Sequence, residues 1–166
     1  DAIARGMARC ALSPKARGFV ARAVSVSDGR SFFPSTSRDQ YTHCVHGLYK
    51  YFKSPLATAE GKKLAAEICA AIADRMLENV RPGTNYDALN ADGSPSTRGL
   101  SRMWNVAPHE AARLPMIYAV ANFMTGDEKY GRECKKYAAE AVAQSKKFSR
   151  NMAPWAQLQM QASLEV

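Results

Sequence analysis

The sequence predicts an all-α protein built from helical hairpins. Most of its 166 residues lie in stretches whose apolar side chains recur every three or four positions, the spacing of one helix face. Pairs of Pro and Gly or Asp and Gly separate these stretches, as expected for turns. A helix pair occurs at 37–80 and again about 68 residues later, at 105–148, and a further helix begins near Pro154. Repeated helical hairpins bury their apolar faces on their neighbours.

The first third of the chain predicts two helices joined by a long loop. The first helix covers 1–12 and ends at Ser13-Pro14. The loop over 18–34 contains Asp28-Gly29 between β-prone residues, which predicts a small hairpin. Ser37 and Gln40 have the spacing of a capping box, so we expect them to begin a helix that ends near Lys53.

The remaining elements follow the same pattern of long loop, helix, short turn and helix. An amphipathic helix is predicted over 57–80, and a connection over 84–103 contains a turn at Asn90–Gly93 with room for short strands. The next helix should begin between 105 and 108 and run to about Met124. It is apolar all round, which predicts burial, and Pro115 should kink it. An amphipathic helix over 127–148 follows.

Composition limits the classes of function. The net charge is +8 and the pI about 9.5, but the basic residues are spread along the chain and interleaved with Glu, and no nucleic-acid-binding motif is present. We therefore expect no nucleic-acid partner. No apolar run reaches the length of a membrane span. The four cysteines form no CxxC and match no zinc spacing, so we expect neither a metal nor another cofactor.

One helix face stands out for its chemistry. His43, His46 and Lys50 fall within about 40° of Asp39 on a helical wheel, opposite an apolar face. A solvated face on which Asp39 complements the helix dipole is one interpretation. A functional face is the other, because two of the three histidines in the chain lie here.

Several motifs together resemble the six-hairpin glycosidase-like proteins of polysaccharide-degrading bacteria, over most of residues 5–130. They are Gly18–Arg22, Asp28-Gly29, Ser37–Thr42, Gly47-Leu48, Ser54–Ala57, Trp104–Arg113 and Thr125–Asp127. The resemblance implies an (α/α)6 toroid, with inner helices around an axis and long loops at one mouth. The chain would supply two hairpins and a lone helix at each end.

We therefore expect residues 1–166 to be a single domain that forms part of a larger toroid. The alternative is a shortened relative that completes its core in a dimer. Exposed inner-helix faces would in either case favour self-association. The resemblance favours a periplasmic or extracellular location, although the residues themselves leave the compartment undecided.

Characterised relatives include unsaturated glucuronyl and rhamnogalacturonyl hydrolases, in which an Asp at the mouth protonates an enol ether and water adds. The resemblance places Asp39 in this role as general acid/base. Glu110, at the start of the second inner helix, becomes the second carboxylate of an ordinary glycosidase scheme. The candidate residues for binding an oligosaccharide are His43, His46, Tyr86, Trp104, His109 and Arg113.

Each of these residues also has a purely structural interpretation. Glu110 and Arg113 can form an i, i+3 pair, Trp104 can belong to the core, and His46 can be a hydrogen-bonded interior residue. Two functions follow: a glycan-processing hydrolase, or a non-catalytic helical-repeat module that binds carbohydrate or a protein. A separation well above about 10 Å between the carboxyls of Asp39 and Glu110, with no other acid near Asp39, would contradict the hydrolase.

Overall fold

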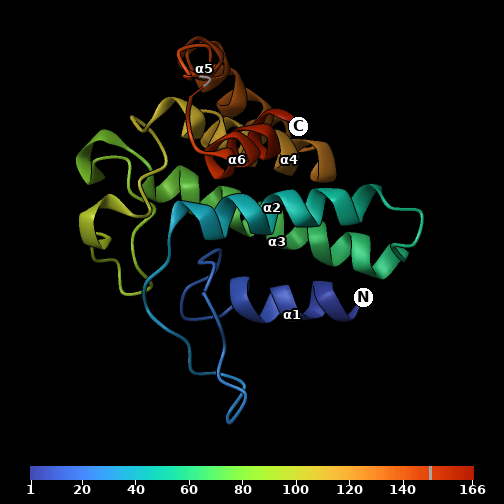
Figure 1. Ribbon diagram of the computed structural model, residues 1–166. Coiled ribbons are helices and arrows are strands. Elements are labelled where there is room, and N and C mark those ends of the chain that lie inside the picture. Colours follow the sequence, from blue (N-terminus) through green and yellow to red (C-terminus); the bar gives the residue numbers. More distant parts are fainter. Residues whose placement is uncertain (150) are drawn as a thin grey trace.

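The computed structural model describes residues 1–149 and 151–166, and the described residues form an all-helical protein (Figure 1). None of these helices is long and apolar enough to cross a membrane. The α-helices are α1 (Ala2–Ala11), α2 (Arg38–Lys53), α3 (Ala59–Asn79), α4 (Arg113–Thr125), α5 (Glu128–Ser145) and α6 (Pro154–Leu164). Three short 3-10 turns, η1 (Pro82–Thr84), η2 (Thr97–Gly99) and η3 (Pro108–Glu110), lie in the connection between α3 and α4.

Helix α3 is the centre of the fold. It packs against α1, α2 and α4, and α4 in turn packs against α5 (Figure 1). Helix α6 lies against α2, α4 and η3. The chain therefore contains two packed helix pairs, α2 with α3 and α4 with α5, and α6 covers the region where the second pair begins.

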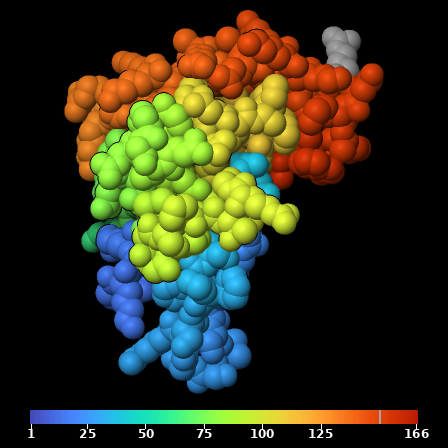
Figure 2. Space-filling view, turned by 90° about the vertical axis from the view of Figure 1, so that its left-hand side faces the viewer, coloured from blue at the N-terminus to red at the C-terminus, as the bar shows by residue number. Residues whose placement is uncertain are grey.

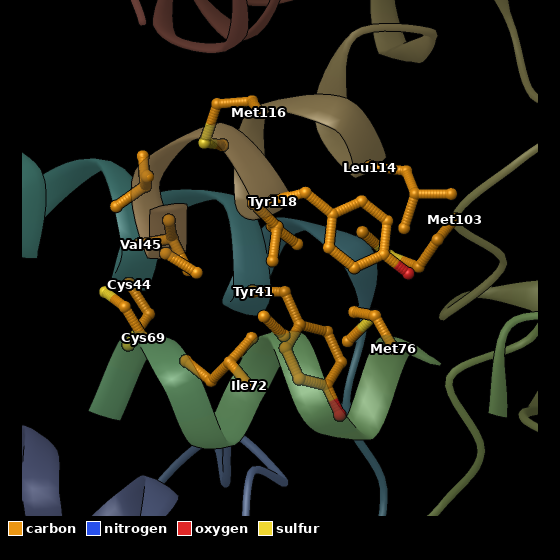
Figure 3. Packing of buried hydrophobic residues seen from close by; sticks show 14 of the residues in the cluster. Tyr41, Cys44, Val45, Cys69, Ile72, Met76, Met103, Leu114, Met116 and Tyr118 are labelled. Carbon is orange, nitrogen blue, oxygen red and sulfur yellow. The ribbon is translucent and has the colours of Figure 1, made fainter. Parts of the chain in front are cut away.

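The core lies where α2, α3 and α4 meet. Tyr41 of α2, Ile72 and Met76 of α3, and Leu114 and Tyr118 of α4 are almost fully buried and lie close together (Figure 3). Each large apolar side chain buried in this way stabilises the fold by about 1.5–3 kcal/mol. The two helix pairs thus share one core, which fixes the positions of their starting residues.

The start of α4 differs from the prediction. A helix from 105–108 was expected, but the chain forms the 3-10 turn η3 at Pro108–Glu110 and α4 begins only at Arg113. Pro115 therefore stands in the first turn of α4, where its missing N–H would have no partner within the helix. The expected kink was wrong, because Pro115 lies at the beginning of a continuous helix.

One further local prediction is corrected, and another is not confirmed. Ser37 is the N-cap residue of α2, but its side chain makes no capping hydrogen bond, and the turn closes through the backbone, where Gln40 N–H donates to Ser37 C=O at 3.0 Å. The small β-hairpins are not confirmed. The described residues contain no strand and only isolated antiparallel bridges, one of them Val24 with Phe32 around the Asp28-Gly29 turn.

The two long connections meet near the start of α2. Ala91 N–H donates to Pro34 C=O at 3.0 Å, and Arg38 N–H donates to Leu100 C=O at 2.9 Å. The second connection is held from within by the buried carboxylate of Asp87. It accepts hydrogen bonds from three donors of its own loop, the hydroxyls of Ser96 and Ser101 and the N–H of Leu89.

Candidate functional site

Arg113 is the centre of a polar cluster at the start of α4. Its side chain is fully buried, and its Nη1 donates to Asp39 Oδ1 of α2 at 2.5 Å. Its Nη2 donates to Gln159 Oε1 of α6 at 2.6 Å and forms an ion pair with Glu110 Oε1 at 3.4 Å. One guanidinium therefore joins α2, α4, α6 and η3.

Glu110 is enclosed by two cations. Its side chain is 9% exposed, and it forms ion pairs with Arg113 and with Arg38 Nε at the start of α2. Arg38 also donates from Nη1 to the carbonyl of Gly99 at 2.9 Å. A buried charge is tolerated when it is paired and hydrogen-bonded in this way, so the contacts of Glu110 describe a residue that holds the two helix starts together.

Asp39 is the open member of the cluster. Its side chain is 45% exposed, and Oδ1 receives both Arg113 and Gln159 Nε2, the latter at 3.2 Å. Oδ2 has no hydrogen-bond partner among the described residues. His43, one turn further along α2, has its Nδ1 2.9 Å from the backbone carbonyl oxygen of Asp39.

Asp39 and His43 line a groove of about 480 Å³ between α1 and the first turns of α2. The lining consists of Ile3, Gly6, Met7, Cys10, Val20, Ala21, Asp39, Gln40, His43 and Cys44. The polar groups therefore come only from α2, and α1 with Val20 and Ala21 supplies an otherwise apolar wall. No Phe, Tyr or Trp side chain contributes to this groove.

His109 is buried beside the cluster and does not line the groove. Its ring lies edge-on to Trp155 of α6, with centroids 5.5 Å apart, and to Phe148 at 6.3 Å. Burial lowers the pKa of His109 below its ordinary value of 6.5, and the nearby Glu110 carboxylate opposes this shift only in part. His109 therefore packs between Phe148, which follows α5, and Trp155 at the start of α6.

Besides His109 and Arg113, three further predicted binding residues lie outside the groove. His46 Nε2 is 2.8 Å from Glu165 Oε2 just beyond α6. Trp104 is buried edge-on against Tyr137, with ring centroids 4.7 Å apart, and the partly buried Tyr86 packs against the same core. The structural interpretation of Trp104 as a core residue thus describes its contacts, whereas His46 is hydrogen-bonded but partly exposed and does not lie in the interior.

The carboxyl groups of Asp39 and Glu110 are close enough together for the hydrolase hypothesis. Both contact the guanidinium of Arg113, so their carboxyl groups lie within the separation of about 10 Å that a two-carboxylate site allows. The cluster thus brings Asp39, Glu110, His109 and Arg113 together. Of these four residues, only Asp39 reaches the groove.

Sequence reasoning missed two residues of the cluster, Arg38 and Gln159. Arg38 directly precedes Asp39 at a predicted helix start, so its position could have been noticed. Gln159 gives no signal in the sequence, since it is one polar residue in a short helix that reaches Arg113 only through the tertiary fold.

No group of three or more His, Cys, Asp or Glu side chains that could hold a metal ion occurs in the part of the chain that the structure describes. Comparisons with models of known protein families, with curated proteins and with solved structures found no match to this chain.

Proposed function

We propose that this chain is a glycan-processing hydrolase of the uronyl type, in which Asp39 acts as the general acid. The observation that carries the proposal is the environment of Asp39. It is the one predicted catalytic carboxylate that lines a groove, and Oδ2 is its oxygen without a partner among the described residues. That oxygen is the atom we assign to proton transfer.

The burial of Glu110 favours a single-acid reaction over the ordinary glycosidase scheme. A two-carboxylate mechanism requires both groups to face the substrate, whereas Glu110 is enclosed by Arg38 and Arg113. Hydration of an unsaturated uronide requires one group that acts as acid and then as base. Asp39 protonates the enol ether, water adds to the resulting cation, and the Asp39 carboxylate takes the proton that this water loses. The hemiketal formed then opens and releases the neighbouring sugar as an alcohol. Arg113 and Gln159 then serve as positioning residues. Both donate to Oδ1, which fixes the orientation of the Asp39 carboxyl group and leaves Oδ2 without a partner among the described residues.

The arrangement of helices supports the proposal of an (α/α)6 toroid. In a toroid, the first helices of successive hairpins lie side by side around the axis. Here α2 packs against α4, and α6 packs against both, while α3 and α5 are the second helices of their pairs (Figure 1). We assign α2, α4 and α6 to the inner ring of the proposed toroid.

Turnover of unsaturated uronides tests this function. The protein is incubated with unsaturated glucuronyl and rhamnogalacturonyl disaccharides, and loss of the ultraviolet absorbance of the double bond is followed. We expect turnover by the wild type and a loss of about 10²–10⁴-fold for Asp39→Asn, the usual contribution of a general acid. The matched control is Glu78→Gln, an exposed residue of α3, which should retain full activity.

A second function is favoured by the apolar character of the groove and by an exposed face of α6. Trp155 and Leu158 of α6 are 58% and 66% exposed, and such side chains are common in protein–protein interfaces. A non-catalytic helical-repeat module would use these surfaces to bind a partner. Absence of turnover on all unsaturated uronides, in a folded wild-type protein, would contradict the hydrolase and leave this second function.

A further inference from the structure

A second cavity, separate from the groove at Asp39, is lined by several basic side chains. It measures about 860 Å³ and lies between the end of α1 and the loop over 24–34. In Figure 2 the N-terminal segment and this loop, in two shades of blue, stand apart with a hollow between them at the lower end of the molecule. The cavity and the groove share no lining residue.

Three cations from three different segments line this cavity. Arg9 comes from α1, Lys15 from the turn that follows it, and Arg30 from the Asp28-Gly29 turn. None of these side chains forms an ion pair or a side-chain hydrogen bond with another described residue. The exposed basic residue Arg17 of the same turn, by contrast, is paired with Glu67.

The acidic side chains nearby accept hydrogen bonds from residues of their own turns. Asp92 is the one acid in the lining, and its Oδ1 accepts from the N–H and the hydroxyl of Ser94 at 2.9 and 2.7 Å. Asp28 lies outside the lining and accepts from the hydroxyl of Ser31 and from the N–H groups of Arg30 and Ser31, and these hydrogen bonds lower the pKa of Asp28 to about 2. The lining therefore has a net charge of +2, and its cations are free to bind an anion.

The rest of the lining is mostly apolar. Leu12 and Phe32 contribute to it, and Phe32 is fixed by its contact with the buried ring of Phe19, with centroids 5.8 Å apart. Pockets that combine an apolar wall with a few converging charged groups are typical of small-molecule sites. A ligand for this cavity needs an apolar body to cover the wall and an anionic group to meet the cations.

We propose that this cavity binds a small organic anion that carries a carboxylate, sulfonate or phosphate group on an apolar body. The site is independent of the proposed hydrolase activity, because it uses no residue of the Asp39 cluster. Its cations are exposed to solvent, so binding should weaken as salt is added.

Anilinonaphthalene sulfonate is the first probe, because its fluorescence rises when it enters an apolar site. We expect saturable binding to the full chain, displacement by decanoate and by phenyl phosphate, and no displacement by decanol, which lacks the charge. Displacement by decanoate alone would identify a fatty-acid-like ligand, and displacement by both would identify a general organic-anion site.

Charge-removing variants locate the binding. Arg9→Gln, Lys15→Gln and Arg30→Gln should each weaken probe binding about threefold to tenfold. The matched control is Arg5→Gln, since Arg5 lies one turn before Arg9 on α1, is exposed and does not line the cavity. All four variants should keep the thermal midpoint of the wild type.

Three results would overturn the proposal. They are no saturable binding of the probe, equal displacement by decanol, and equal weakening by Arg5→Gln and Arg9→Gln. The last result would assign binding to the overall positive charge of the protein and not to this cavity.

Discussion

The start of α2 and the 3-10 turn η3 that precedes α4 carry the same chemical group in two different environments. Asp39 and Glu110 both contact the guanidinium of Arg113, yet their side chains are 45% and 9% exposed. Glu110 is covered because η3 packs against α5 and α6, whereas Asp39 borders the groove beside α1. The packing of neighbouring helices thus decides which of two carboxylates can meet a substrate.

The largest predicted effect comes from removing the cation that the two carboxylates share. Arg113→Met leaves Glu110 buried with one of its two partners and releases the α6 contact to Gln159. Breaking a buried ion pair from one side costs about 3–5 kcal/mol, so we expect a loss of this size in urea unfolding. Arg132→Met, at an exposed site on α5, should change stability by less than about 0.5 kcal/mol. A loss below about 1 kcal/mol for Arg113→Met would show that the cluster does not hold the helices together.

The direct comparison of the two acids should give the next largest effect. Glu110→Gln removes a buried charge from between Arg38 and Arg113, and we expect a loss of about 2–4 kcal/mol in the free energy of unfolding. Asp39→Asn should cost about 1 kcal/mol or less, because the half-exposed site lets water replace the lost interaction. Equal losses for the two variants, measured by urea unfolding, would contradict the difference in their roles.

Asp87 tests whether burial alone makes a carboxylate structural. Like Glu110 it is buried, but its partners are two hydroxyls and a backbone N–H of its own loop. Hydrogen bonds to a charged group are worth about 1.5–3 kcal/mol, and we expect Asp87→Ala to destabilise the fold by an amount in this range. The nearby exposed acid Asp92 provides the control, and Asp92→Ala should have a smaller effect on the urea midpoint.

The helices themselves could be predicted well from the sequence. The apolar periodicity located α1, α2, α3 and α5 to within a few residues, and Pro154 marked the start of α6. The first residue of α4 could not be predicted, because a helix with apolar residues on every side has no periodic pattern that would locate its first turn. Pro115 was consistent with a kink or with a first turn, and only packing against α3 and α5 decides between them.

The candidate site could be predicted only in part. Asp39 lies in the first turn of α2, as local patterns predict. The prediction that Glu110 begins the next inner helix was wrong, because Glu110 lies in η3 and α4 begins only at Arg113. The contact of Glu110 with Arg113 was expected from their i, i+3 spacing. The contacts of Gln159, Trp155 and Glu165 could not be foreseen, because they join segments far apart in the sequence. Gln159 is 120 residues from Asp39 and 46 residues from Arg113.

The smallest predicted effect is a pH dependence at His109. Its folded-state pKa lies below 6.5, so the unfolded chain takes up a proton first as the pH falls through 6.5, and the folded state loses stability in that window. The urea midpoint should therefore fall between about pH 7.5 and pH 5.5. His109→Phe keeps a ring against Trp155 and should flatten this dependence, whereas His43→Gln at an exposed site should not. An unchanged slope in His109→Phe would assign the pH dependence to other groups.

The difference between Asp39 and Glu110 can be measured directly by carboxyl labelling. The folded protein is treated with a water-soluble carbodiimide and a small amine, and the modified residues are identified by mass spectrometry. We predict that Asp39 is labelled in the folded protein and that Glu110 is labelled only after unfolding in urea. Labelling of both carboxylates at similar rates in the folded protein would contradict the account, since Glu110 would then be as available to a substrate as Asp39.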